Sequence, residues 1–219
     1  MNKLIYDVGF NDGSDTLFYL SKDFNVIGID ANPSLIKKGM IVFEKEIKEG
    51  RLTLLNLAMS DKKEIRKFFI NTRVDVWSSL DETLGKRKDE NYYAIDVQCQ
   101  TMDYVVSTYG VPHYMKIDIE GYDHIVLKSL TECPQYISVE DSCEQSITTL
   151  ASLGYKKFKL ISQGEIVKQS GNDWTFKDGS SGRFGEDTPG EWVTQEELNV
   201  MFKNTLQQTK DWFDIHATF

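Results

Sequence analysis

The sequence predicts an α/β protein built on a doubly wound, mostly parallel sheet. Apolar, β-rich segments alternate with segments of helical periodicity over the first two-thirds of the 219 residues. Strands separated by helices indicate β-α-β units, whose right-handed crossovers place helices on both faces of a parallel sheet. The glycine-rich stretch directly after the first apolar run is typical of the point where such a sheet binds a ligand.

The first half of the chain contains four expected strands, at 3–9, 25–30, 51–60 and 62–72. A helix is expected over 14–23, with Ser14 or Asp15 as its N-cap. A second helix over 32–50 has Pro33 near its start and Gly50 past its end, the usual places for these residues. A polar, charged stretch then extends to about Asn91.

The second half continues the alternation of strands and helices. A short strand and a helix are expected within 95–110, followed by strands at 113–121, 135–141 and 156–162 with helices at 121–130 and 146–155. From about Gly164 the composition shifts to Gly, Ser and Asp, which predicts a long loop. Thr194 and Glu197 have capping-box spacing for a helix over 194–206. We therefore expect one domain over 1–219, with a core over about 1–163 and a C-terminal loop and helix over 164–219.

Composition excludes several classes of partner. The net charge is −9 and no long basic stretch occurs, which argues against binding to nucleic acid or to anionic membranes. The three cysteines, Cys99, Cys133 and Cys143, form no CxxC motif and are expected to be buried free thiols of a reducing compartment. No signal peptide is readable, and no apolar run approaches the ~20 residues that span a bilayer. We expect a cytoplasmic protein.

The loop "DVGFNDGSDT" differs from a dinucleotide fingerprint. It reads G-x-N-x-G, and Ser14 and Asp15 stand where the third glycine of G-x-G-x-x-G would pack the helix against the strand. Asp12 and Asp15 bring negative charge to the start of this helix, where a pyrophosphate would be repelled. A cationic or zwitterionic ligand would be favoured. This indicates S-adenosylmethionine rather than a nicotinamide cofactor.

Asp30 ends the second strand, roughly 20 residues after the loop, where a carboxylate accepts hydrogen bonds from ribose hydroxyls. A carboxylate at this position is predicted for S-adenosylmethionine and for a nicotinamide cofactor alike. The structural alternative is that Gly9 and Gly13 only form a turn and that Asp30 is the N-cap of the following helix.

Five motifs together resemble those of FkbM-type methyltransferases: "YDVGFNDGSDTLFYL", "VIGIDANP", "NLAMSD", "VQCQTMDYV" and "MKIDIEGYDHIVLKSL". The resemblance covers roughly residues 4–141 and implies a Rossmann-like sheet of the class I methyltransferase type. It also implies O-methyl transfer from S-adenosylmethionine, often to sugars or polyketides. One departure is "GFN" in place of the commoner "GAN", which puts the large Phe10 in the loop.

The resemblance also implies a set of cofactor-binding residues. The methionine part of S-adenosylmethionine would lie against Asp7, Gly9, Asn11, Gly13 and Thr16. Asp30 and Ala31 would meet the ribose, and the adenine would lie near Asn56, Ala58 and Ser60.

Candidate catalytic residues lie at the ends of the later strands. Methyl transfer to a hydroxyl is an in-line displacement, so the protein must align the acceptor and remove its proton with a base or a metal. In "KIDIEG", Lys116, Asp118 and Glu120 share one face of a strand. Asp118 together with Glu140 and Asp141 forms a candidate Mg²⁺ site. The alternative is that Glu140 caps the next helix and Lys116 pairs with a carboxylate.

The histidines and the C-terminal loop supply further candidates. His113 is expected to be exposed, and His124 faces either the crevice or the surface. His216 shares a face with Asp214 if the tail is extended, which makes it a candidate base beside Asp118 and Lys116. The loop over 178–192 is either a surface loop or a lid over the substrate, whose sugar-facing residues would be Trp174, Arg183, Phe184 and Trp192.

The sequence therefore predicts an S-adenosylmethionine-dependent O-methyltransferase acting on a hydroxyl of a sugar or other small acceptor. The alternatives are a nicotinamide-dependent oxidoreductase, against which the missing third glycine and the acidic loop argue, and a cofactor-binding scaffold that has lost catalysis. A homodimer is left open.

Overall fold

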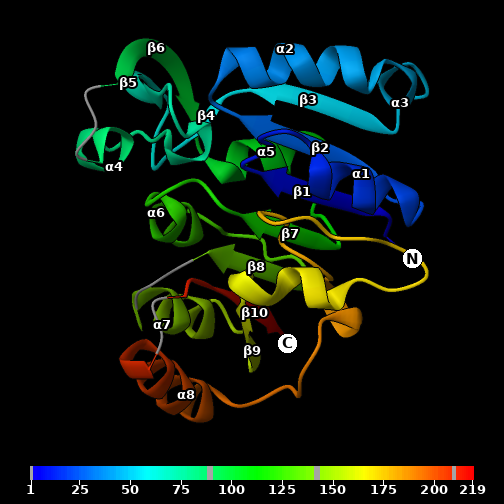
Figure 1. The fold of residues 1–219 in the computed structure, drawn as a ribbon, viewed down its shortest axis with the longest axis vertical. Coiled ribbons are helices and arrows are strands. Elements are labelled where there is room, and N and C mark those ends of the chain that lie inside the picture. The colour runs from blue at the N-terminus through cyan, green and yellow to red at the C-terminus, as the bar shows by residue number, and fades with distance from the viewer. Residues whose placement is uncertain (1, 88–90, 141–143, 209–210) are drawn as a thin grey trace.

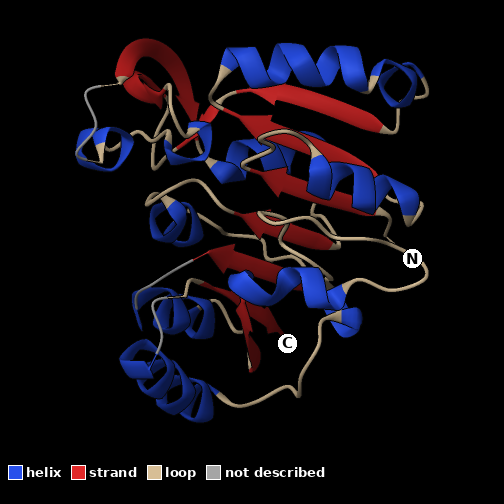
Figure 2. Ribbon diagram, in the orientation of Figure 1, coloured by secondary structure: helices blue, strands red, loops and turns tan. Residues whose placement is uncertain are grey.

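The protein is described by a computed structural model that covers residues 2–87, 91–140, 144–208 and 211–219 (Figure 1). Its centre is a seven-stranded sheet with the strand order β3-β2-β1-β7-β8-β10-β9, and these strands follow one another from top to bottom of Figure 2. β10 is antiparallel to both of its neighbours, and the other strand pairs of this sheet are parallel. The prediction of a doubly wound, mostly parallel sheet is confirmed.

The bounds of the elements follow the sequence pattern closely. The strands of the central sheet are β1 Leu4–Val8, β2 Asn25–Asp30, β3 Leu52–Asn56, β7 Tyr114–Ile117, β8 Tyr136–Glu140, β9 Lys157–Ser162 and β10 Phe213–Thr218. The helices around it are α1 Ser14–Ser21, α2 Pro33–Val42, α3 Glu44–Lys48, α5 Met102–Tyr109, α6 Asp123–Lys128, α7 Glu144–Ser152 and α8 Gln195–Gln208.

A second, three-stranded sheet has the order β4-β6-β5 and is formed by β4 Ala58–Met59, β5 Glu64–Asn71 and β6 Tyr92–Gln100. The expected strand over 51–60 is thus two strands, because the chain leaves the central sheet after Asn56. β5 and β6 pair antiparallel over eight residues each, so β6 is longer than the short strand predicted. The connection between them holds the short helices η1 Asp75–Trp77 and α4 Glu82–Lys86.

Two apolar clusters bury the two faces of the central sheet. Alternate β1 residues point to opposite faces, so Tyr6 and Val8 pack with α5, α6, α7 and α8, whereas Ile5 packs with α1 and α2. The segment between β9 and α8 also covers the α1 face, through Ile166 and Phe176. This segment, predicted as a long loop, contains the 3₁₀-helices η2 Gln163–Gln169 and η3 Gly185–Asp187.

The ends of the helices show where local prediction was right and where it was wrong. Thr194 and Glu197 form the predicted capping box at the start of α8. The predicted N-cap of α1 is wrong, because Gly13 holds that position in a left-handed conformation, with φ of 80°. The N-cap of α2 is Asn32, whose side chain accepts from the Ser34 N–H. Asp30 is therefore not that cap.

The cysteines and the helix lengths can also be compared with the sequence-based predictions. Cys99 is buried and Cys133 half-buried, both as free thiols, while Cys143 lies outside the described residues. Among the helices of the described ranges, none is both long and apolar enough to cross a membrane.

Gly13 has a packing role that gives a testable consequence. A Cβ added there would lie 2.6 Å from the Phe43 ring and 2.7 Å from the Phe10 ring, and the φ of +80° already disfavours other residues. We expect Gly13→Ala to lower the free energy of unfolding by about 2–4 kcal/mol, from strain and overpacking together.

Urea unfolding of the Gly13→Ala variant checks this, with Gly50→Ala as the matched control. Gly50 has a similar φ of +73° but nothing within 4 Å of an added Cβ, so its substitution isolates the backbone cost. Equal losses in the two variants would show that the aromatic packing is not what requires a glycine at position 13.

Candidate active site

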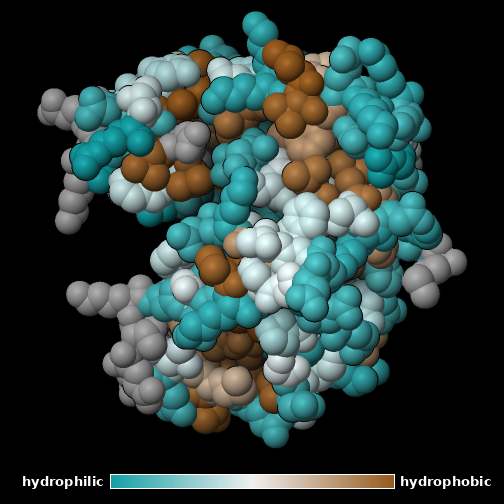
Figure 3. Space-filling view, turned by 45° about the vertical axis from the view of Figure 1, so that its right-hand side comes forward, coloured by the Kyte–Doolittle hydropathy of each residue, from teal (hydrophilic) through white to brown (hydrophobic). Residues whose placement is uncertain are grey.

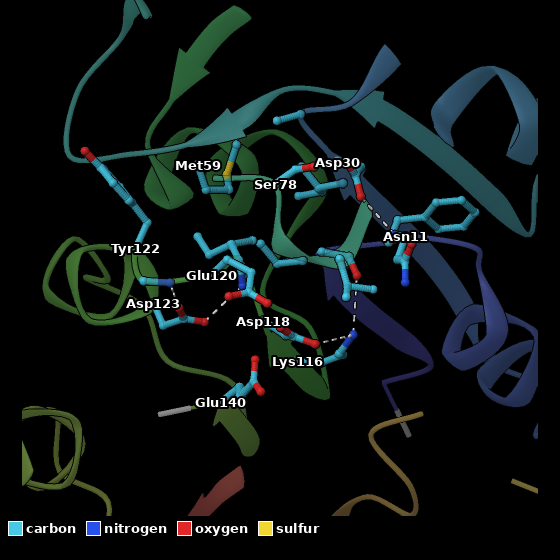
Figure 4. Close-up of a pocket in the computed structure, with 18 of the residues that line it drawn as sticks. Asn11, Asp30, Met59, Ser78, Lys116, Asp118, Glu120, Tyr122, Asp123 and Glu140 are labelled. Atoms are coloured by element: carbon cyan, nitrogen blue, oxygen red, sulfur yellow. Dashed lines mark hydrogen bonds and ion pairs between the residues drawn. The ribbon is translucent and has the colours of Figure 1, made fainter. Parts of the chain in front are cut away.

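A cavity of about 750 Å³ opens at the carboxyl ends of the central strands, where the strand order reverses between β1 and β7 (Figure 4). Its wall comes from the ends of β2, β7 and β8, from the residues that follow β1, β2 and β7, from the start of β10, and from the segment between β5 and β6. Figure 3 shows the surface hollowed on its left side, toward which the carboxyl ends of these strands point in Figure 1. Open α/β sheets bind their ligands in this position.

Four carboxyl groups form a row across this edge of the sheet. Val8 is in register with Ile29 and with Ile117. Ile117 is in turn in register with Val139. The residues that come directly after these four in the chain therefore also lie at the same height along the sheet. Those next residues include Asp30, Asp118 and Glu140, and Asp214 of β10 pairs directly with Glu140. Residues at one level share a face of the sheet, which places all four carboxyls on the α1 face, in the cavity wall.

Lys116 is the cation at the centre of this row. Its ammonium lies 3.1 Å from Asp15, 3.4 Å from Asp118 and 3.6 Å from Asp7, and it donates a hydrogen bond to the Gly9 carbonyl. Burial lowers the pKa of Lys116, but the carboxylates of Asp15, Asp118 and Asp7 outweigh burial and raise it well above its usual value. The side chain therefore remains an ammonium that holds the carboxylates in place, and it is not a base.

Asp118 is a half-buried member of the row, and it lines the cavity with 33% of its side chain exposed. Figure 4 shows Lys116 and Glu140 on either side of it. The charge of Asp118, burial and a hydrogen bond to Asp118 raise the pKa of Glu140 strongly, which favours a proton shared between these two carboxyl groups. Burial and the charge of Asp118 likewise raise the pKa of Asp214 well above its usual value.

Asp30 is held rigidly at the opposite end of the row. One carboxylate oxygen accepts from the Asn11 N–H at 2.9 Å and the other from the Asn32 N–H at 2.7 Å. Burial raises the pKa of Asp30 to about 6, although these hydrogen bonds oppose the shift. The side chain is thus fixed by the glycine loop and by the start of α2, with its remaining lone pairs free to accept from a ligand.

The structure brings half of the predicted cofactor-binding residues into the cavity wall. Gly9, Asn11, Asp30, Ala31 and Ala58 line it. Gly9 and Asn11 have positive φ values of 94° and 48°, and the N–H groups of Gly9 and Phe10 donate to the Ile29 carbonyl. The loop therefore turns sharply back over β2, which carries its backbone along the cavity.

The other predicted cofactor-binding residues do not line the cavity: Asp7, Gly13, Thr16, Asn56 and Ser60. They support residues that do line the cavity. The buried Asp7 accepts a hydrogen bond from the Thr16 hydroxyl and lies beside Lys116. The Asn56 amide donates to the carbonyls of Asp30 and Ala31, which fixes the turn after β2.

His216 is not placed where a base must lie. It belongs to β10, is 1% exposed, and stacks on Tyr114 behind the cavity wall. Burial lowers its pKa to about 3, so the imidazole is neutral. His124 does line the cavity, and His113 is half-buried between Phe24 and Tyr136.

The predicted metal ligands come together only in part. Asp118 and Glu140 meet, while Asp141 lies outside the described residues. Within the described ranges, no group of three or more histidine, cysteine, aspartate or glutamate side chains has an arrangement suited to a metal ion.

The predicted lid residues do not line the cavity: Trp174, Arg183, Phe184 and Trp192. Trp174 and Phe184 pack on Phe18 of α1, and the Trp192 indole donates to Glu186 and stacks on Tyr136. Trp174 and Phe184 thus help to bury the face of the sheet beside α1, which differs from the sugar-facing role that the lid alternative gives them.

Sequence reasoning missed a wall of the cavity formed by the loop after β7 and the segment before β6. Arg87 forms an ion pair with Glu120 and stacks over the Trp77 ring. The Ser79 hydroxyl donates to the Glu120 carbonyl, and Asp123 accepts from the backbone after β7. Glu120 and Gly121 both have positive φ, and the "EG" dipeptide was the signal that this loop turns sharply.

The model of the FkbM methyltransferase domain family matches residues 7–157, which is more than half of the chain. No curated protein matches the chain. Two similar solved structures are a methyltransferase FkbM from Methylobacillus flagellatus KT and an S-adenosylmethionine-dependent methyltransferase from Archaeoglobus fulgidus.

The first of these structures has a TM-score of 0.51 and 14% identity over 73% of this chain. This chain spans only 40% of the length of that protein, so the similarity concerns the fold. The second has a TM-score of 0.45 and 13% identity over all of this chain and 86% of its own. The family match covers the glycine loop, the carboxylate at the end of β2 and the acidic ends of β7 and β8, and on this ground the chain belongs to the FkbM methyltransferase family.

Proposed function

We propose that the protein transfers a methyl group from S-adenosylmethionine to a hydroxyl group of a small or carbohydrate acceptor. The observation that carries the proposal is the charge of the cavity. Among its described lining residues, eight are acidic and only Lys116 and Arg87 are strongly basic, and both of these are already paired with carboxylates. The crowding of the acidic residues helps to raise the pKa of Glu140 and Asp214, and a ligand with positive charge, such as the sulfonium and amino groups of S-adenosylmethionine, would relieve it.

The residues present fit the parts of this cofactor. Asp30 presents a fixed carboxylate of the kind that accepts from ribose hydroxyls. An apolar stretch of wall beside it, from Leu57, Met59 and Phe68, suits a purine ring. The backbone of the glycine loop passes the centre of the cavity, next to Asp118. A nicotinamide dinucleotide fits less well, because its pyrophosphate would face Asp12 and Asp15.

The chemistry of the chain is then to align and deprotonate the acceptor. When bound, S-adenosylmethionine supplies an electrophilic methyl group with a good leaving group. Asp118 is positioned to accept the proton of the acceptor hydroxyl, since it lines the cavity with 33% of its side chain exposed. Lys116 and Glu140 both contact Asp118 and so fix its carboxylate in the cavity wall.

The proposal is tested by incubating the protein with methyl-labelled S-adenosylmethionine and a panel of sugars and small alcohols. We expect label to appear on the oxygen of at least one acceptor, together with stoichiometric S-adenosylhomocysteine. Cofactor binding without label transfer across the whole panel would favour the scaffold that has lost catalysis.

Asp30 gives a prediction about cofactor affinity. Asp30→Ala should weaken S-adenosylmethionine binding by about 1.5–3 kcal/mol, because hydrogen bonds to a charged group contribute this much. Titration calorimetry measures the change, with a thermal melt to confirm folding. Asp61→Ala is the matched control, since Asp61 is exposed and does not line the cavity. Equal affinity of the two variants for S-adenosylmethionine would show that Asp30 does not bind the cofactor.

A further inference from the structure

The end of the cavity farthest from Asp30 is built from β8, β10 and β9. The Gln163 N–H donates to the Trp212 carbonyl across the end of the β9–β10 pair, and Asp214 pairs with Glu140 on the other side of β10. Residues directly opposite in antiparallel strands share a face, and so do residues two apart along a strand. Gln163, Trp212, Asp214 and Glu140 therefore point to one side, and all four line the cavity.

Gln163 carries an unmet hydrogen-bonding requirement. It is only 9% exposed, and its side-chain nitrogen is buried without a hydrogen-bond partner in the part of the chain that the structure describes. A buried amide donor without a partner is costly, and native proteins leave few of them. Because a half-turn about the last side-chain bond exchanges the oxygen and nitrogen of an amide, Gln163 can present this donor to the cavity that it lines, where a ligand oxygen can accept from it.

The other groups at this end define what kind of ligand fits. Asp214 and Glu140 place two carboxyl groups beside Asp118, and the nearest cation, Lys116, already faces three carboxylates. A phosphate or carboxylate would face the charge of Asp118 here, whereas an ammonium group would favour the ionised forms of Asp214 and Glu140, whose crowding raises their pKa. Trp212 is 52% exposed and offers an aromatic surface beside Gln163, on which a sugar-like ring or a cation can lie.

We propose that this end, lined by Gln163, Trp212, Asp214 and Glu140, is the acceptor subsite, and that the acceptor is a hydroxylated ring bearing a protonated amine, such as an amino sugar. The amine lies among the carboxyl groups, a ring oxygen or hydroxyl accepts from Gln163, and a neighbouring hydroxyl faces Asp118. The inference rests on the proposed function, because it assumes that S-adenosylmethionine occupies the end of the cavity around Asp30.

The experiment measures the binding of glucosamine, glucose and glucose 6-phosphate to the full chain saturated with S-adenosylhomocysteine, by ligand-observed NMR at pH 6.5. We expect glucosamine to bind at least about tenfold more tightly than glucose, which corresponds to about 1.4 kcal/mol for one charge-assisted contact. Glucose 6-phosphate should bind more weakly than glucose. Equal binding of the three sugars, tightest binding of the phosphate, or no binding of glucosamine would overturn the proposal.

Two variants separate the subsite from general effects on the fold. Gln163→Met keeps the shape but removes the donor, and it should weaken glucosamine and glucose alike by about five- to tenfold. Gln145→Met, on the exposed side of α7, should change neither. Asp214→Asn should reduce the preference for glucosamine over glucose. If Gln163→Met binds both sugars as the unmodified protein does, the subsite is wrong.

The affinity for S-adenosylhomocysteine is measured first, because it separates a failure of the proposed function from a failure of the acceptor subsite. If S-adenosylhomocysteine does not bind, the proposed function fails. If it binds with unchanged affinity in Gln163→Met and the sugars show no preference for the amine, only the acceptor subsite fails.

Discussion

Asp118→Asn should slow methyl transfer by on the order of a hundredfold or more while leaving the affinity for S-adenosylmethionine nearly unchanged. Removal of a positioned proton acceptor typically costs this much. The substitution keeps the size of the side chain but removes the charge that faces the cavity between Lys116 and Glu140. Single-turnover kinetics with the true acceptor measure the rate, and calorimetry measures the affinity.

The control for this variant is Asp96→Asn, which removes an exposed carboxylate of β6 that pairs with Lys67 at 2.8 Å. It should leave turnover unchanged. A second experiment adds a chelator to the unmodified protein. It would slow methyl transfer as Asp118→Asn does only if Asp118 acts through a bound Mg²⁺. Normal turnover of Asp118→Asn would make this residue an ordinary carboxylate at the end of a strand.

Lys116→Met should have the largest effect on stability. It removes the cation that lies within 3.6 Å of Asp7, Asp15 and Asp118 and leaves buried carboxylates without compensation. Loss of one partner from a buried ion pair typically costs about 3–5 kcal/mol of the free energy of unfolding. Urea unfolding at pH 7.5 measures the change.

The exposed pair of Lys67 and Asp96 again gives the comparison. Lys67→Met removes an ammonium with 60% of its side chain exposed, and ion pairs at the surface contribute about 1 kcal/mol or less. A loss for Lys116→Met as small as that for Lys67→Met would show that water, and not Lys116, compensates the carboxylates around it.

The order of strands and helices in the core could be predicted from the sequence because each element has a local signal. Apolar runs such as "NVIGID" form buried parallel strands, and the carboxylate at the end of such a run must then lie at the edge where ligands bind. Asp30 and Asp118 were found in this way. The same logic places Glu140 beside Asp118, since adjacent parallel strands end at the same level.

The parts that were not predicted depend on contacts between distant segments. The family resemblance implies a cofactor contact at Gly13, since the sequence alone does not show that the Phe10 and Phe43 rings fill the space beside it. His216 shares a face with Asp214, as expected, but only the pairing of β10 with β8 and β9 shows that this position is buried. The ion pair of Arg87 and Glu120 joins residues 33 positions apart, for which no local pattern exists.

Titration calorimetry with S-adenosylmethionine and with NAD⁺ tests the central claim, that the acidic cavity binds a cationic methyl donor. The predicted result is one saturable site for S-adenosylmethionine, with no measurable binding of NAD⁺, whose pyrophosphate would face Asp12 and Asp15. Saturable binding of NAD⁺, or the absence of any heat from S-adenosylmethionine with the protein folded, would contradict it.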